Sequence, residues 1–187
     1  MLSIAAGPSG FLAVGTTGPE ATPTGSVTCT SPDGATWTRS DPALPGDGGL
    51  MVSAIPTDAG FLVVGSDLDE RRAMAWISAD GRGPWTATPE QPSLQNHGLK
   101  IRMTDVTSSA GQFVAVGDYL FGTQYGNATS WTSADGLTWT QAPRNAALNQ
   151  GEMLAVTPGP TQLVAVGDFG APDNYVPTVW LSPLPGG

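Results

Sequence analysis

Hydrophobic residues recur along this chain in one order, with a period of about 50 residues. The clearest segment is a short apolar run, which reads Gly-Phe-Leu-Ala-Val-Gly at 10–15, Gly-Phe-Leu-Val-Val-Gly at 60–65, Gln-Phe-Val-Ala-Val-Gly at 112–117 and Gln-Leu-Val-Ala-Val-Gly at 162–167. Such runs between turn-forming residues predict strands that are covered on both faces. We name this segment strand b and its last residue the closing glycine.

Three other segments keep a fixed place around strand b. Strand a precedes it and begins with methionine in every copy, at 1–4, 51–54, 103–106 and 153–156. Strand c follows at 27–31, 74–78, 130–133 and 179–182, and a turn then leads to a short strand d. Four short antiparallel strands per repeat predict an all-β fold, a β-propeller of four-stranded antiparallel blades.

The four repeats predict blades at approximately residues 1–40, 50–88, 101–142 and 152–187. The last blade ends after strand c and lacks its outer strand. The 187 residues therefore form either a single propeller domain or a segment of a larger propeller. Open blade edges expose unpaired backbone groups, so we also expect self-association through them.

The turn between strands c and d has a recurring sequence in the first three repeats. It joins a serine, an aspartate and a tryptophan, in the sets Ser31, Asp33 and Trp37, then Ser78, Asp80 and Trp85, then Ser133, Asp135 and Trp139. The aspartates can accept hydrogen bonds from turn amides, while Gly34, Gly81 and Gly136 can adopt positive φ. These residues are therefore expected to be structural.

These turns resemble the Asp boxes (BNR-like repeats) of sialidase-like propellers, which read Ser-x-Asp-x-Gly-x-Thr-Trp between strands c and d. Two of the copies here are one residue shorter, and the middle copy moves the glycine. The resemblance implies a propeller whose Asp boxes lie on the face away from the active site. Kelch repeats share the period but need a paired glycine after strand b, which this chain lacks.

Composition narrows the class of partner. The net charge of −9 and a pI of about 4.2 oppose binding to nucleic acid, and no apolar stretch is long enough for membrane insertion. The single cysteine, Cys29, excludes an intrachain disulfide. Few lysines, one cysteine and abundant Thr, Gly and Pro favour a bacterial protein that is extracellular or on the cell surface, although the first residues lack signal-peptide features.

Strand order predicts two different faces. The a–b and c–d turns share one face and are short, whereas the b–c segments (16–25, 66–72, 118–127, 168–177) and the d–a segments share the other and vary between repeats. Variable loops on a regular scaffold are the usual place for a site. Polar and aromatic residues there suit recognition of a protein or a glycan, and the candidates are Arg71, Arg72, His97, Asp118, Tyr119, Tyr125, Asp168 and Tyr175.

Acidic residues occur at equivalent positions of several repeats, where they could bind a cation. Asp118 and Asp168 directly follow a closing glycine, and Asp67 lies one position later in its repeat. A ring of these carboxylates could hold calcium, while capping of turns is the competing interpretation. Otherwise no cofactor is expected. Asp105, the charged residue in the middle of a strand a, is expected to face a solvated central channel.

Catalysis is the main alternative to binding. The sialidase-like resemblance implies three arginines, an Arg-Ile-Pro motif, an acid/base aspartate and a tyrosine–glutamate pair, but this sequence has no Arg-Ile-Pro and no glutamate near a tyrosine. We therefore expect a non-catalytic binding or scaffold module. The alternatives are a sialidase-like glycoside hydrolase whose site is incomplete in this chain and a purely structural repeat module.

Overall fold

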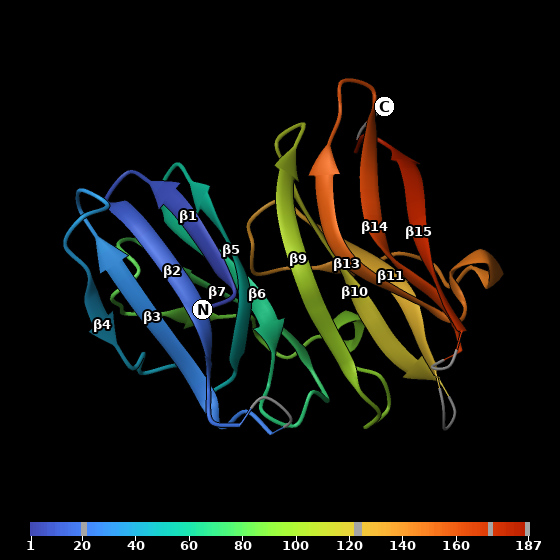
Figure 1. Cartoon of the computed structure of the whole chain (residues 1–187), viewed down its shortest axis with the longest axis horizontal. Helices are drawn as coiled ribbons and strands as arrows, with labels where there is room; N and C mark the ends of the chain where they lie inside the picture. The colour runs from blue at the N-terminus through green and yellow to red at the C-terminus, as the bar shows by residue number, and fades with distance from the viewer. Residues whose placement is uncertain (20–21, 122–124, 172–173, 186–187) are drawn as a thin grey trace.

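The computed structural model describes residues 1–19, 22–121, 125–171 and 174–185, and only the backbone of Phe121, Tyr125 and Ala171. It confirms an all-β propeller architecture, in which each repeat forms one antiparallel sheet (Figure 1). The first two sheets contain β1 (Ser3–Gly7), β2 (Gly10–Thr17), β3 (Gly25–Ser31) and β4 (Thr38–Ser40), then β5 (Leu50–Thr57), β6 (Gly60–Ser66), β7 (Ala73–Ser78) and β8 (Thr86–Ala87).

The other two sheets follow the same order. They contain β9 (Ile101–Ser109), β10 (Gln112–Phe121), β11 (Tyr125–Ser133) and β12 (Thr140–Gln141), then β13 (Gly151–Pro158), β14 (Gln162–Ala171) and β15 (Asn174–Pro183). Two 3-10 turns, η1 (Pro92–Leu94) and η2 (Ala146–Leu148), lie in the d–a connections. Within the described residues the fourth blade has three strands, as expected, and no helix is long and apolar enough to cross a membrane.

The b–c connections of the last two blades differ from the sequence interpretation. Residues 118–121 and 125–127 continue β10 and β11 as a paired hairpin, and residues 168–171 and 174–177 extend β14 and β15 in the same way. These stretches carry tyrosine, phenylalanine and valine, which favour extended pairing over a loose loop. The prediction of long loops there was wrong.

The closing glycines lie inside strand b rather than at its end. A β-bulge in strand a brings a backbone carbonyl of that strand against each of the last three. A Cβ atom on Gly65, Gly117 or Gly167 would overlap the carbonyl oxygen of Leu50, Arg102 or Glu152, respectively. The repeated glycine therefore permits close backbone approach across the two inner strands.

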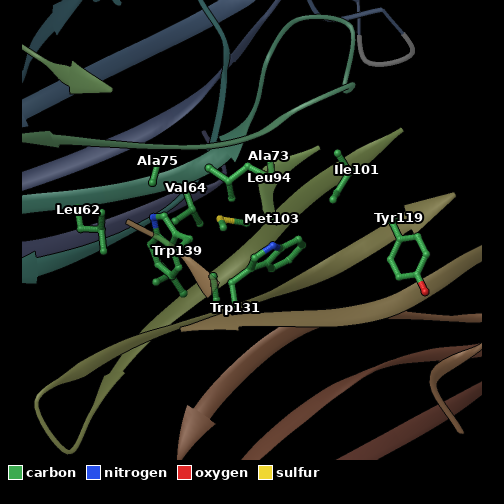
Figure 2. Packing of buried hydrophobic residues seen from close by; sticks show 12 residues of the cluster. Leu62, Val64, Ala73, Ala75, Leu94, Ile101, Met103, Tyr119, Trp131 and Trp139 are labelled. Atoms are coloured by element: carbon green, nitrogen blue, oxygen red, sulfur yellow. The ribbon is translucent and has the colours of Figure 1, made fainter. Parts of the chain in front are cut away.

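Side chains from neighbouring blades form the core. Figure 2 shows the cluster between the second and third blades, where Leu62 and Val64 of β6 lie opposite Met103 of β9 and the buried Trp131 and Trp139. Equivalent clusters join the first blade to the second and the third to the fourth. Each sheet therefore packs against its neighbours through its two faces. Each interface between successive blades is formed by one face of each of the two sheets.

Polar contacts also link the inner strands. The Ser53 hydroxyl donates to Asp105 Oδ1 at 2.6 Å, and Asp105 Oδ2 accepts from the Val156 amide at 2.8 Å. Asp105 therefore connects the a strands of three successive blades. Asp105 is half-buried, and both of its carboxylate oxygens are hydrogen-bonded to neighbouring blades, which is a linking role that the sequence did not predict.

Two blade faces have no neighbour within the described chain. Ile4 on the first blade is 61% exposed, whereas its counterparts Ala54, Val106 and Val156 are at most 8% exposed. We call this side, with Ile4, Cys29 and Trp37, the first open face. The opposite side of the fourth blade carries Val166, Val179 and Leu181, with Val179 and Leu181 60% and 61% exposed. We call it the second open face.

The c–d turns contain the hydrogen bonds that their sequence predicts. Asp33 Oδ1 accepts from the amides of Ala35 and Thr36 at 2.9 and 2.8 Å, and Asp135 Oδ1 accepts from those of Leu137 and Thr138. In the middle copy the Asp80 carboxylate accepts from the Arg82 amide. These turns have the three expected positive-φ glycines, Gly34, Gly81 and Gly136.

Asp135→Asn is expected to reduce stability only at pH values where the native carboxylate is ionised. The Thr138 amide and other donors outweigh desolvation and hold the pKa of Asp135 at about 2, below its usual 3.8. A depressed pKa contributes stability above pH 3.8 that is lost as the pH falls through about 2. Since the group is exposed, the loss at pH 7 should be no more than about 1 kcal/mol.

Urea unfolding between pH 2 and pH 7 measures this difference. The exposed Asp58 in the a–b turn of the second blade supplies a matched variant, Asp58→Asn, which should leave the free energy of unfolding within about 0.5 kcal/mol. A constant deficit of Asp135→Asn across the whole pH range would contradict the electrostatic explanation.

Candidate functional site

The b–c and d–a connections meet on one face of the propeller. The Asn96 side chain donates to the Leu120 carbonyl at 2.5 Å, which joins a d–a loop to the end of β10. Arg72 forms an isolated bridge with Gln95, and Asn127 forms one with Asn149. The variable segments are therefore held together by hydrogen bonds between successive blades, and we call this surface the loop face.

A network of opposite charges lies where the inner strands reach the loop face. Arg102, near the start of β9, donates from Nε to Asp118 Oδ1 at 2.8 Å and from Nη2 to Glu152 Oε1 at 2.5 Å. Its Nη1 lies 3.4 Å from Glu70 Oε1, and Glu70 also pairs with Lys100. Residues of the second, third and fourth blades thus converge on one guanidinium group.

The pKa values of Glu70 and Glu152 in this network are shifted in opposite directions. Burial acts to raise the pKa of Glu70, but the hydrogen bond from Lys100 and the charge of Arg102 outweigh it and hold that pKa below 4.5. Burial raises the pKa of Glu152, and the Arg102 charge opposes this without cancelling it. The carboxylates raise the pKa of Arg102 against its burial, so the guanidinium stays protonated. The site therefore offers fixed donors beside acceptors of different basicity.

A cavity of about 550 Å³ opens beside this network. Its walls come from the first three blades and combine apolar with polar and charged groups, namely Thr16, Thr22, Pro23, Leu50, Val52, Ser66, Leu68, Asp69, Glu70, Lys100, Arg102, Met103 and Thr104. The volume lies in the range of small-ligand sites, and the lining is more polar than is usual for them, with charged groups from the second and third blades.

Sequence reasoning missed the centre of this site. Arg102 and Glu152 are not among the predicted site residues, although both occupy the position directly before the strand-a methionine of neighbouring repeats. Opposite charges at equivalent positions of adjacent blades are the sequence signal for such a contact. Of the loop-face candidates whose side chains the structure describes, Asp118 is the one with a hydrogen bond to Arg102.

The remaining candidates lie around the network in different settings. Tyr119 is buried in the core between the second and third blades, with Arg144 5.0 Å above its ring. Its expected surface position was wrong, because the extended β10 turns its side chain inward. The Tyr125 side chain lies outside the described residues. Tyr175 is exposed at the start of β15 and is available to a partner.

The polar candidates also lie in different surroundings. Arg71 is exposed and its amide donates to Asp67, whereas the Arg72 side chain lies 3.4 Å from Glu90. His97 is exposed with a positive φ in the loop after η1. Asp168 lies across the strand pair from Glu152. The structure therefore does not collect the eight candidates into one site.

Two of the three aspartates considered for a cation make separate contacts. Asp67 Oδ1 accepts from the amides of Arg71 and Arg72, which is a capping arrangement, and Asp118 pairs with Arg102. Among the residues that the structure describes, no group of three or more His, Cys, Asp or Glu side chains has a geometry that could hold a metal ion.

Comparisons with known proteins support the fold. No protein-family model matches the sequence, and no curated protein matches it significantly. Among solved structures, a GH32 β-fructofuranosidase mutant of Bombyx mori in complex with sucrose is similar over 96% of this chain and 46% of its own, with 12% identity and a TM-score of 0.59. A GH43 β-1,3-galactosidase with galactodeoxynojirimycin covers 71% and 43%, with 14% identity and a TM-score of 0.49.

The β-fructofuranosidase has a β-propeller fold, and the likeness to it supports the same fold for this chain. The chain covers 46% and 43% of the lengths of these two solved structures. At such low identity the likeness concerns the fold, and function has to be argued from the residues of this chain.

Proposed function

We propose that this chain is a non-catalytic β-propeller binding module that recognises a protein or a glycan through its loop face. The observation that supports this most is the cavity beside the Arg102 network, because it combines apolar walls with charged donors and acceptors that other contacts hold in place. We further propose that the chain acts outside the cell, as its composition suggests.

A neutral glycan suits the cavity better than a charged ligand. Sugar hydroxyl groups can both donate and accept, so they can use Lys100 and the neighbouring carboxylates together. An anionic ligand would meet Asp69 and Glu70 in a chain of net charge −9. The exposed Tyr175 ring adds flat contact area at the other side of the loop face.

Removal of cavity groups is expected to weaken binding. Glycan-array screening and then calorimetry with the best glycan test this, using Lys100→Ala and Asp69→Ala. Each variant removes a group that lines the cavity, and losing one charged hydrogen bond, worth about 1.5–3 kcal/mol, should lower affinity tenfold or more. Tyr175→Ala should have a smaller effect, and Asp58→Ala on the opposite face should have none.

Two results would contradict the glycan proposal. Equal affinities of Lys100→Ala, Asp69→Ala and Asp58→Ala would place the ligand elsewhere. Binding to proteins but to no glycan would favour a protein ligand. The same variants would then show whether that ligand binds at the cavity.

Hydrolysis of the array glycans is the outcome that would favour an enzyme instead. Glu152 has a raised pKa and Glu70 a lowered one, and such divergence is common in acid/base carboxyl pairs. If glycans are cleaved, Glu152→Gln should abolish the activity. The hydrogen bond of Glu152 to Arg102 gives it a structural explanation as well, which is why binding is our first proposal.

A further inference from the structure

The two open faces are the two halves of the interface that joins consecutive blades. At each internal interface, one blade contributes Leu12 and Val14 or their equivalents in strand b, and the next contributes its strand-a side chains. Val166 on the second open face is the equivalent of Val14, Val64 and Val116, which are at most 2% exposed. Ile4 on the first open face is the equivalent of Val156, which packs in the same cluster as Val116.

The sizes of the strand-c residues are also complementary between the open faces. Inside the chain, a large Trp76, Trp131 or Trp180 packs towards a preceding blade. The preceding blade then presents small or medium residues in its own strand c, for example Thr28 and Thr30 or Ser130 and Thr132. At the open faces this order is reversed, because Cys29 replaces the tryptophan while Val179 and Leu181 replace the smaller residues.

The two open faces lie at the two ends of the series of blades, the first on the first blade and the second on the fourth. In Figure 1 the first two sheets lie at the left of the view and the last two at the right. A contact that joins two different surfaces closes into a ring when a second copy satisfies both ends.

We propose that two copies of this chain assemble head to tail, with the first open face of each on the second open face of the other. The result is a closed ring of eight blades with two identical new interfaces. Each interface continues the packing that the chain already uses three times internally, and it removes from water the apolar side chains of the two open faces, such as Ile4, Val179 and Leu181. This proposal is independent of the ligand of the loop face.

Complementary charge variants test the arrangement. Light scattering during gel filtration should give twice the chain mass of 19.1 kDa for the unmodified protein. Ile4→Lys alone and Val166→Glu alone should each halve the observed mass, because every interface contains one copy of each face. An equimolar mixture of the two variants should recover the dimer, since one interface then joins Lys to Glu and the other keeps the native Ile4 and Val166.

The controls separate this result from misfolding and from other assemblies. Both substituted side chains are already exposed in the single chain, so circular dichroism should show folded monomers. Leu99→Lys changes an apolar residue of similar exposure (42%) in a d–a loop and should remain dimeric. A monomeric unmodified chain would overturn the proposal and assign the open faces to further blades of a longer protein. Failure of the mixture to dimerise, or growth of open-ended polymers, would overturn head-to-tail closure at two copies.

Discussion

Gly65→Ala is expected to lower the free energy of unfolding by about 3 kcal/mol or more. The new Cβ would overlap the carbonyl oxygen of Leu50, and the other near atoms, Leu50 C and Val52 N, are also backbone. Backbone pairing between β5 and β6 prevents that oxygen from moving away, so the two inner strands of the second blade have to separate locally.

Thermal and urea unfolding measure this effect, and the expected fall in Tm is roughly 6–12 °C. Gly25→Ala is the matched control, because Gly25 is also in a strand but its Cβ would meet only the Thr17 hydroxyl at 3.4 Å. It should change stability by less than about 1 kcal/mol. Similar losses for the two variants would show that the closing glycine is not required for close backbone approach.

Trp139→Ala should destabilise the protein by about 3–5 kcal/mol, as expected for truncation of a buried aromatic side chain. The Trp139 ring is 2% exposed in the core between the second and third blades, and its indole Nε1 donates to the Gly136 carbonyl at 3.0 Å. Truncation therefore leaves a cavity at an interface that holds two blades together.

Trp37→Ala provides an internal comparison at the same position of the repeat. The Trp37 indole makes the same hydrogen bond, to the Gly34 carbonyl at 3.0 Å, but the side chain is 39% exposed on the first open face. Both substitutions should be made in the Ile4→Lys background, so that dimerisation does not cover Trp37. There Trp37→Ala should cost about 1–2 kcal/mol, since much of its ring already contacts water. Equal losses in the free energy of unfolding would show that packing of Trp139 against the neighbouring blade contributes little to the stability of the protein.

The sequence predicted the repeat-scale features of this fold correctly because they depend on local pattern. The apolar runs, the turn sequences and the missing outer strand of the last blade all follow from residues close together in the chain. The conformation of Gly34 and the hydrogen bonds of Asp33 belong to the same class, since one turn contains every group involved.

Features that depend on contacts between repeats were harder to predict. Tyr119 was expected on the surface, because the extension of β10 into a paired hairpin could not be distinguished from a loop. The role of Gly65 depends on a bulge in the neighbouring strand, which leaves no mark on the sequence around that glycine. Prediction of the Arg102 network requires a comparison of equivalent positions in adjacent repeats, because Arg102 of one blade pairs with Glu152 of the next.

Each sheet of this propeller consists of one uninterrupted stretch of chain, with strands in their order of synthesis. A blade can therefore complete its backbone hydrogen bonds while the next repeat is still being translated, without waiting for a strand from the other end of the protein. Its apolar faces, however, remain uncovered until a neighbour is made. The growing chain thus carries one bare leading face at every stage, and chaperones would meet the same kind of surface after each repeat.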